Sequence, residues 1–446
     1  MKLDDLVMEK SNSDKKSRKW IYDSGSTLLR SLNLPYLTFI GVGTAIGAAI
    51  FVVTGHAIES AGPAIILTYL LGAIFALAGG TSYAELASSM PSAGGGYHFV
   101  NRAFKGTPAF LAGWFGWMGN VVDCSVGAIA FSLSIWYYFR WIEPFSLAII
   151  TLIVFAIINF RGVKSLSRVE TILTSILVIG VIFYIGDASL HADVTRLSPF
   201  FPYGILPAVL MISYIFPTFA GYETIATMSE EVKIAGKNVP RAIFLTILIS
   251  AILFTGLTVV TLLSAPLEVY AGSPTPVQDV ANYFMGPVGA FLIAICSITA
   301  SLTTVNGAMA TATRVSFSMS RDGLLPPFFE KIHAKYKIPY RTLILSLILS
   351  ILLVLTRSIN LIVYMVSLGY IVNSMLVGLS VIQLRRKEPH LFRPFKVPFY
   401  PFTTILAIAT SAIMIPMLST EALILGLVFA IIGLITIAIT KRIKKR

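Results

Sequence analysis

The chain has 446 residues, of which 56% are hydrophobic and only 12% are charged, and its mean hydropathy is +0.81. Soluble proteins carry about 25% charged residues, so this composition excludes an ordinary soluble domain and indicates a membrane protein. The net charge of +13 would suit a nucleic-acid partner, but the placement of the basic residues argues against one.

Twelve apolar stretches follow a polar, basic segment of 33 residues, which lacks the apolar core and cleavage site of a signal peptide. We expect this segment to be a cytoplasmic tail near anionic lipid. Most of the stretches have the length of about 20 residues that crosses a bilayer as a helix. They cover residues 34–55, 64–83, 108–138, 145–160, 169–183, 204–227, 243–264, 287–315, 342–355, 361–384, 402–417 and 421–440, before a basic tail at 441–446.

Basic residues fix the expected topology. With the amino terminus in the cytoplasm, only Arg140, Arg196 and Arg357 of the 34 Lys and Arg fall in outward-facing loops. This matches the excess of positive charge found in cytoplasmic loops. We therefore expect a multi-pass protein of the cell membrane with both termini in the cytoplasm.

The first stretch contains a candidate break. Gly41, Gly43 and Gly47 lie close together between residues 41 and 51, within an apolar segment. An unpaired backbone group in hydrocarbon costs several kcal/mol, so a broken helix is tolerated there only where it lines a cavity or meets a ligand. The segment predicts a transport site.

A second break is expected in the sixth stretch. Pro217 removes a backbone donor, and Gly221 loosens the helix one turn later. Breaks in stretches one and six are typical of an inverted repeat of five plus five helices. Residues 34–384 then form a ten-helix transport core and residues 385–440 add two helices. Helix ends that meet at such breaks offer N–H groups to an anion and carbonyls to an ammonium, which suits a zwitterion.

Ionisable residues inside the stretches are few, and each is a functional hypothesis by default. Asp123 lies midway along the third stretch and Glu223 in the sixth. Cys124 and Cys296 are isolated in apolar stretches, and no His, Cys or carboxylate spacing predicts a metal or phosphate site. An ATP-driven pump or an enzyme is therefore not indicated, and no cofactor is expected.

Seven segments, in this order, resemble the prokaryotic amino acid permeases of the amino acid/polyamine/organocation (APC) superfamily. They lie at residues 43–51, 61–64, 83–97, 159–164, 230–242, 321–326 and 393–398. The resemblance covers nearly the whole chain. It implies an all-α membrane protein in which two broken helices surround a central site, and transport by alternating access.

The resemblance also implies roles for residues at the two breaks. The N–H groups of Gly47, Ala48 and Ala49 would hold the substrate carboxylate, with close packing of small residues as the alternative. Carbonyls near four residues would hold the amino group: Ala45, Phe216, Pro217 and Ala220.

Pro217 stands where the family usually has a gating aromatic, so we expect Phe216 or Phe219 to take that role, or a different gate. Glu223 matches a position that is often acidic in the family and responds to substrate or proton. Its alternative is a carboxylate that pairs with Ser or Tyr groups.

Asp123, with Asn120 one turn earlier, occupies a position that in relatives lines the pocket for the substrate side chain. A carboxylate there favours a cation such as lysine, arginine or ornithine, because an unpaired buried carboxylate would protonate. A proton-coupling role and a structural role with Asn120, Ser125 or another helix remain open.

Two observations bear on which ion, proton or sodium, is coupled to transport. Proton-coupled relatives carry a Lys on the fifth helix, and the corresponding position here is Leu177. Ala300, Thr303 and Thr304 share one helix face. Sodium-binding members of the fold use this arrangement, and carbonyls of Gly43, Ile46 and Ala300 with the two hydroxyls would supply five oxygen ligands. Hydrogen bonds of the hydroxyls within their own helix are the alternative.

The sequence thus predicts a secondary transporter of amino acids, with cationic substrates and sodium coupling as the finer hypotheses. An amino acid exchanger, a proton-coupled permease and a polyamine transporter stay open, as do a monomer and a homodimer. Glu85, His98 and Arg102 are interpreted as solvated charges, with gating ion pairs as the alternative.

Overall fold

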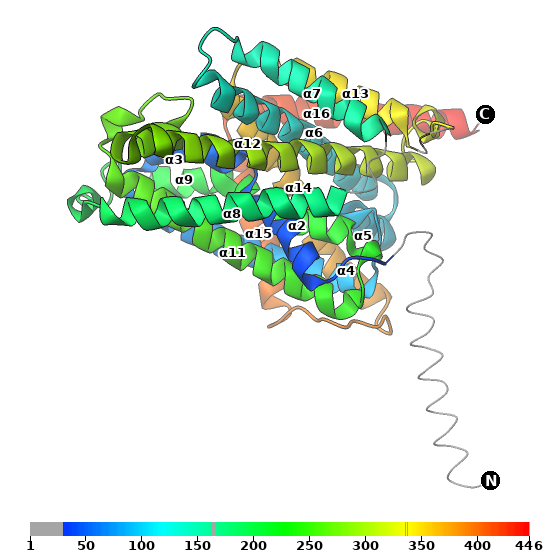
Figure 1. Cartoon of the computed structure of the whole chain (residues 1–446). Helices are drawn as coiled ribbons and strands as arrows, with labels where there is room; N and C mark the ends of the chain where they lie inside the picture. The colour runs from blue at the N-terminus through cyan, green and yellow to red at the C-terminus, as the bar shows by residue number, and fades with distance from the viewer. Residues whose placement is uncertain (1–29, 162–165, 335, 337, 446) are drawn as a thin grey trace.

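The described part of the chain, residues 30–161, 166–334, 336 and 338–445, is a helical bundle in this computed structural model (Figure 1). The first 29 residues of the predicted tail and part of the motif at 159–164 lie outside it. The longer helices are α2 (Leu34–Ile46), α3 (Ala49–Ala61), α4 (Ile65–Ser89), α5 (Gly95–Phe104), α6 (Gly106–Trp136), α7 (Pro144–Arg161), α8 (Leu166–Leu190), α9 (Ile205–Ile215), α10 (Gly221–Thr227), α11 (Ala235–Ser264), α12 (Pro276–Arg321), α13 (Tyr340–Val354), α14 (Ile359–Lys387), α15 (Phe402–Met414) and α16 (Thr420–Lys445).

Nine helical stretches among the described residues are long and apolar enough to cross a membrane. One of them, Ala49–Ser89, joins α3 to α4 through the short 3-10 helix η1 (Gly62–Ala64). Among the three shorter apolar helices, Tyr340–Val354 and Phe402–Met417 match predicted stretches nine and eleven, whereas Leu34–Ile46 covers only the first part of predicted stretch one. The membrane class is therefore confirmed, while the count of twelve spans and the inverted repeat stay predictions.

The first helix breaks within the predicted segment, at Gly47 and Ala48 between α2 and α3. Gly41 and Gly43 remain helical. A Cβ at Gly43 would collide with the Thr174 hydroxyl, so this glycine serves the close approach of α2 to α8. Of the three glycines, only Gly47 lies at the break.

The second break is the 3-10 helix η3 (Phe216–Phe219), which separates α9 from α10. It lies against the first break, because α2 packs on both η3 and α10. A Cβ at Gly221 would collide with the Gly41 carbonyl oxygen and lie 2.9 Å from the Ala45 nitrogen. The glycine therefore lets the backbones of α10 and α2 touch.

Three features were not predicted from the sequence: the helix α5, the first segment of α12, and the helical structure of the basic tail. The amphipathic helix α5 follows α4, and α12 begins at Pro276, before the predicted stretch. Gly286 interrupts α12 with φ of 67°, so its first turns form a separate segment. The predicted basic tail at 441–446 continues α16 as far as Lys445.

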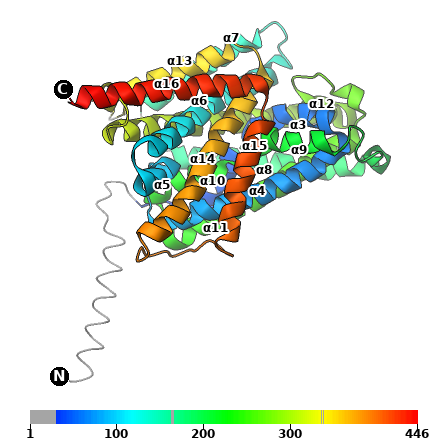
Figure 2. The ribbon, with the colours of Figure 1, turned by 180° about the vertical axis from the view of Figure 1, so that it is seen from behind.

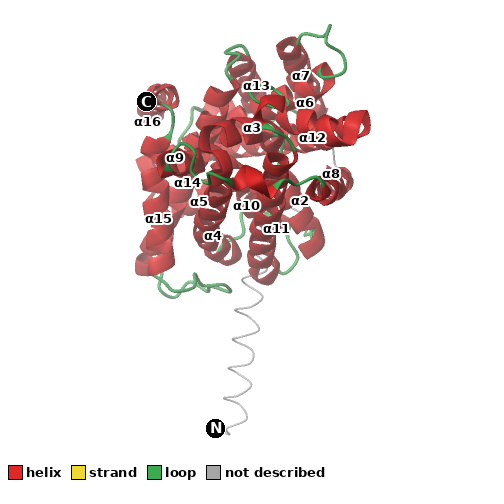
Figure 3. Ribbon diagram, turned by 90° about the vertical axis from the view of Figure 1, so that its left-hand side faces the viewer, coloured by secondary structure: helices red, strands yellow, loops and turns green. Residues whose placement is uncertain are grey.

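Helix α6 packs against both α12 and α14, and these three helices border the two breaks. Viewed along the bundle, α10 lies near the middle, while α15 and α16 lie at the edge (Figure 3). From behind, α16 runs beside α6 and α14, and α15 lies beside α14 (Figure 2). Edge helices expose apolar side chains such as Ile179 and Phe402, as lipid contact requires.

Both described chain ends lie at one end of the bundle, where α2 begins and α16 ends (Figure 1). We call this the tail end. It also holds α5 and the loop between α14 and α15. The loops before α7 and between α11 and α12 lie at the far end.

Candidate functional site

A small pocket lies between the two helix breaks, and we call it the central pocket. Its lining comes from six helices and from η3: Thr44, Ala45, Gly47, Ala49, Asn120, Asp123, Pro217, Ala220, Gly221, Thr224, Thr304, Ala308 and Tyr370. Seven of the residues predicted from the sequence to bind substrate are therefore brought together. The cavity volume is about 20 Å³, enough for one water molecule and too small for an amino acid.

The backbone N–H groups at the first break differ in their partners. The Gly47 N–H donates to the Gly43 carbonyl at 3.2 Å, and the Ala48 N–H donates to Thr304 Oγ1 at 3.1 Å. Ala49 begins α3, where an α-helix leaves its first N–H groups without acceptors in its own turn. Of the three predicted carboxylate donors, Gly47 and Ala49 line the pocket, and the N–H groups of Gly47 and Ala48 are already bonded.

Asp123 lies in the central pocket and accepts a hydrogen bond from the Tyr370 hydroxyl at 3.2 Å. The predicted neighbours do not bind it: Asn120 donates to the Gly116 carbonyl, and Ser125 to backbone carbonyls. Within the described residues, Asp123 has no ion pair. The predicted alternative of a bond to another helix is present, since Tyr370 belongs to α14.

Close backbone contact between two glycines places Tyr370 beside Asp123. A Cβ at Gly369 would lie 2.7 Å from the Gly119 Cα and 2.9 Å from the Gly119 nitrogen. Any larger residue would push α14 away from α6. The pair of glycines thus sets the separation at which the Tyr370 hydroxyl reaches the carboxylate.

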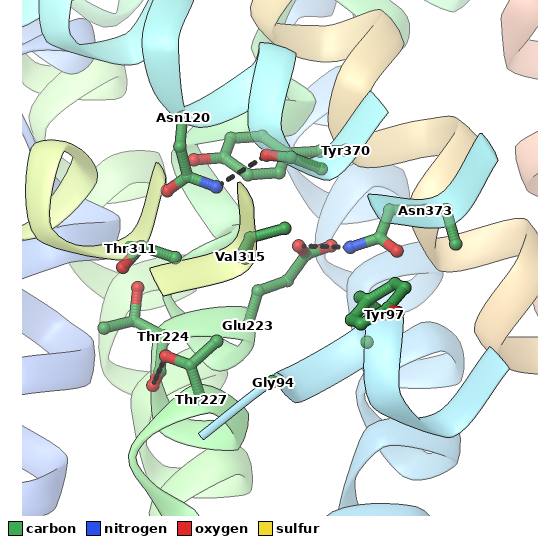
Figure 4. A pocket seen from close by; sticks show the side chains of 13 residues that line it. Gly94, Tyr97, Asn120, Glu223, Thr224, Thr227, Thr311, Val315, Tyr370 and Asn373 are labelled. Carbon is green, nitrogen blue, oxygen red and sulfur yellow. Dashed lines mark hydrogen bonds between the residues drawn. The ribbon is translucent and has the colours of Figure 1, made fainter. Parts of the chain in front are cut away.

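Glu223 lies outside the central pocket, in a second pocket that we call the adjoining pocket (Figure 4). Tyr83 Oη donates to Glu223 Oε1 at 2.9 Å, and Asn373 Nδ2 donates to Oε2 at 2.9 Å. The predicted pairing with Tyr groups is therefore present. The two pockets share Asn120, Thr224 and Tyr370 as a common wall.

Neither aromatic expected to replace a gate at Pro217 lines either pocket. Phe219 is fully buried and packs against Tyr69 and Phe254. Phe216 is also buried. The aromatic ring between the two pockets is Tyr370, which sequence reasoning missed because nothing along the chain links it to residue 123.

The predicted ion ligands lie where α2 meets α12. Thr303 Oγ1 donates to the Ala300 carbonyl at 2.8 Å and lies 3.4 Å from the Gly43 carbonyl. Thr304 Oγ1 also donates to the Ala300 carbonyl, at 2.9 Å. Ile46 is buried at the end of α2. Both hydroxyls thus bond within their own helix, as the alternative expects, while the oxygen atoms still gather at one place.

Helix α8 adds two polar residues to this region. The buried Thr174 hydroxyl faces Gly43 and has no hydrogen-bond partner among the described residues. Glu170, one turn away, is 5% exposed and accepts a hydrogen bond from Asn306 at 3.0 Å. Glu170 lies inside predicted stretch five. An ionisable residue inside an apolar stretch is a candidate functional residue, so the sequence could have identified Glu170. The neighbouring Leu177 is buried.

Glu85 corrects the interpretation of the tail-end charges as solvated. Its side chain is fully buried and accepts from Arg385 Nε at 3.0 Å, while Arg393 Nε lies 3.2 Å from Oε1. The Val397 N–H donates to Oε2 at 2.7 Å. We call these groups the Glu85 clamp. It fastens the loop after α14 to α4.

Comparison with known proteins relates the chain to amino acid permeases. The family model described as amino acid permease matches residues 32–443. A branched-chain amino acid permease, BcaP, of Bacillus subtilis is 28% identical over 92% of this chain and 92% of its own. A methylthioribose transporter of Bacillus subtilis is 28% identical over 85% and 87% of the two chains. A vacuolar cationic amino acid transporter 4 of Arabidopsis thaliana is 28% identical over 82% and 65%.

Proposed function

Because the chain belongs to the amino acid permease family, we propose that it carries amino acids with a positively charged side chain across the membrane by alternating access. General amino acid transport follows from the family, so the chain is a transporter and not an enzyme. The positive charge of the substrate side chain is the finer proposal. The residue that supports it is Asp123.

Asp123 is a buried carboxylate without a cationic partner among the described residues. Asp123 faces a pocket at the centre of the bundle, and its one hydrogen-bond partner among the described residues is the neutral Tyr370. A buried carboxylate without a cation is costly, whereas one paired with a guanidinium or ammonium is much less so. A cationic substrate side chain supplies the missing charge.

The backbone at the break favours an amino acid over a polyamine. Ala49, the first residue of α3, lines the central pocket beside Ala45 and Ala220. A helix amino terminus attracts a carboxylate. A polyamine has no carboxylate for this group to bind.

The names of the relatives leave the substrate class to experiment. One relative is named for branched-chain amino acids, one for methylthioribose and one for cationic amino acids. The carboxylate of Asp123 is the observation on this chain that favours the last class.

Sodium coupling is the proposal for the driving force. Oxygen atoms of Gly43, Ala300, Thr303 and Thr304 gather between α2 and α12. The Thr174 hydroxyl, which has no hydrogen-bond partner in the described part of the chain, faces the same glycine from α8. A desolvated alkali ion needs such a shell of hard oxygen ligands. With the tail end in the cytoplasm, as the basic loops predict, sodium and substrate enter from the far end.

Uptake into proteoliposomes tests the proposal. Labelled arginine, lysine, alanine and leucine are offered with a sodium gradient or a pH gradient imposed separately, and spermidine is added as a competitor. We expect arginine and lysine to accumulate with the sodium gradient. The proposed substrate class is overturned if neither enters nor competes, and sodium coupling is overturned if uptake ignores the sodium gradient.

A further inference from the structure

The two buried carboxylates lie in adjoining pockets with a common wall, one after the other on a line toward the tail end. We propose that the adjoining pocket is a second binding station, at which Glu223 receives the positively charged side chain of the substrate after it leaves Asp123. This inference rests on the proposed cationic substrate. It adds a site to the path of that substrate.

Glu223 has the charge for this role. It is 8% exposed, and its two oxygen atoms accept hydrogen bonds from Tyr83 and Asn373. Both donors are neutral, and no described Lys, Arg or His forms an ion pair with it. Like Asp123, the carboxylate therefore has hydrogen bonds without a counter-charge, which is an expensive arrangement inside a protein.

Asn373 gives a second, independent indication of a cation. Its Nδ2 donates to Glu223, but its Oδ1 is buried and has no hydrogen-bond partner among the described residues. The residue is 5% exposed and lines the adjoining pocket, where Figure 4 shows it beside Glu223. A buried acceptor without a donor costs free energy. A ligand that carries several N–H donors satisfies it.

The geometry also selects the kind of group. Glu223 and Asn373 both line this pocket and each carries an acceptor oxygen, and the hydroxyl-bearing residues Thr224, Thr227 and Thr311 line it too. A guanidinium has five N–H donors and no acceptor, so it can engage both oxygen atoms at once. An ammonium does so with three.

The position of the pocket makes it a station on a path. Asn120, Thr224 and Tyr370 form the wall shared with the central pocket. On its other side the pocket is bounded by Gly94, Gly96 and Tyr97, in and beside α5 at the tail end. A side chain that leaves Asp123 toward the tail end passes Tyr370 and meets Glu223 next.

Two stations in series lower the barrier for release. A cation that leaves a buried carboxylate for an apolar channel loses its partner and pays the cost of a buried lone charge. A second carboxylate in the next pocket avoids this state. Removal of Glu223 should therefore slow the passage of charged substrates more than that of uncharged ones.

Arginine and citrulline form the matched pair for the test, since they are nearly isosteric and differ in side-chain charge. Turnover of each is measured by counterflow in proteoliposomes at saturating substrate. For Glu223→Gln we expect the ratio of arginine to citrulline turnover to fall about ten-fold. Glu223→Asp, which keeps the charge, should retain most of the ratio. Glu268→Gln, which changes an exposed carboxylate at the far end, should leave it unchanged.

Equal slowing of the two substrates would overturn the proposal, because a structural role or contact with the substrate's own amino group affects both alike. An unchanged ratio combined with loss of a response to the pH gradient would also overturn it and assign Glu223 to a proton. Arginine affinity within about three-fold of the wild type shows that the variant is folded. If Glu223→Gln fails this check, Asn373→Leu replaces it, and a smaller fall in the ratio is expected because Glu223 keeps its charge.

The outcomes separate this inference from the proposed function. If the wild type does not prefer arginine to citrulline in binding, the cationic substrate is wrong. If the wild type prefers arginine and Asp123→Asn loses the preference, the proposed function stands. An unchanged turnover ratio in Glu223→Gln then overturns the second station alone.

Discussion

Two threonine hydroxyls of α12, those of Thr303 and Thr299, have different surroundings and form a matched pair for substitution. Thr303 lies 3.4 Å from the Gly43 carbonyl of α2, whereas the hydrogen bonds of Thr299 within the described residues go to the carbonyls of Ile295 and Cys296 in its own helix. Only the first hydroxyl lies between two helices. It is therefore the one whose loss should affect an ion held there.

Thr303→Val removes that hydroxyl with little change in volume. We expect the sodium concentration for half-maximal arginine uptake to rise at least ten-fold, because one of few oxygen ligands is lost. Thr299→Val is the control and should leave the sodium dependence unchanged. The same sodium dependence in both variants would contradict the ion site.

His98 makes the stability of the tail end depend on pH. Burial lowers the pKa of His98 below its ordinary value of 6.5, and the nearby Arg102 and Arg321 act in the same direction against Asp322. Well above pH 6.5 the side chain is neutral in both the folded and the unfolded state. As the pH falls below 6.5, the unfolded state binds the proton first, so stability is lost.

We therefore expect the melting temperature of the wild type in detergent to fall relative to that of His98→Gln as the pH is lowered from 7.5 to 5.5. Thermal unfolding of both proteins across this range measures the difference. A constant difference between the two would show that His98 titrates as it does in the unfolded chain.

Between helices, the strongest polar connection at the tail end is the Glu85 clamp. Glu85 is fully buried on α4, Arg385 lies in the last turn of α14, and Arg393 lies in the loop that follows. Arg385 also lies over the Tyr400 ring, with 3.8 Å from Cζ to its centroid. By contrast, the pair of Arg102 and Glu388 is partly exposed, at 42% and 33%.

Glu85→Gln leaves two arginines of the clamp without their carboxylate. Breaking a buried ion pair costs about 3–5 kcal/mol, so we expect a large loss in the free energy of unfolding. Glu388→Gln breaks an exposed pair and should cost about 0–1 kcal/mol. Thermal and denaturant unfolding of both variants gives the comparison. Equal losses would show that the clamp is no stronger than a surface pair.

Local sequence predicts the elements better than it predicts their partners. The break at Gly47 and the 3-10 turn at Pro217 follow from glycine and proline in apolar stretches, so both were found. Tyr370 meets Asp123 across 247 residues, and Arg385 meets Glu85 across 300. Neither pair leaves a local pattern, because only the packing of helices brings them together.

For the whole molecule, the pockets show why transport needs a change of shape. The central and adjoining pockets are each about 20 Å³, so an amino acid fits neither without movement of the surrounding helices. Helices α2, α3, α9 and α10 end beside the central pocket. Half-helices can tilt without breaking a continuous hydrogen-bond ladder. This arrangement is what alternating access around a fixed site requires.

The most direct test of the account is equilibrium binding of arginine and citrulline to the purified protein, compared between the wild type and Asp123→Asn. We predict that the wild type binds arginine at least ten-fold more tightly than citrulline, a difference of about 1.4 kcal/mol. In Asp123→Asn the two affinities should become equal within about two-fold. A wild type without preference, or a variant that keeps it, would contradict the assignment of Asp123 to the substrate side chain.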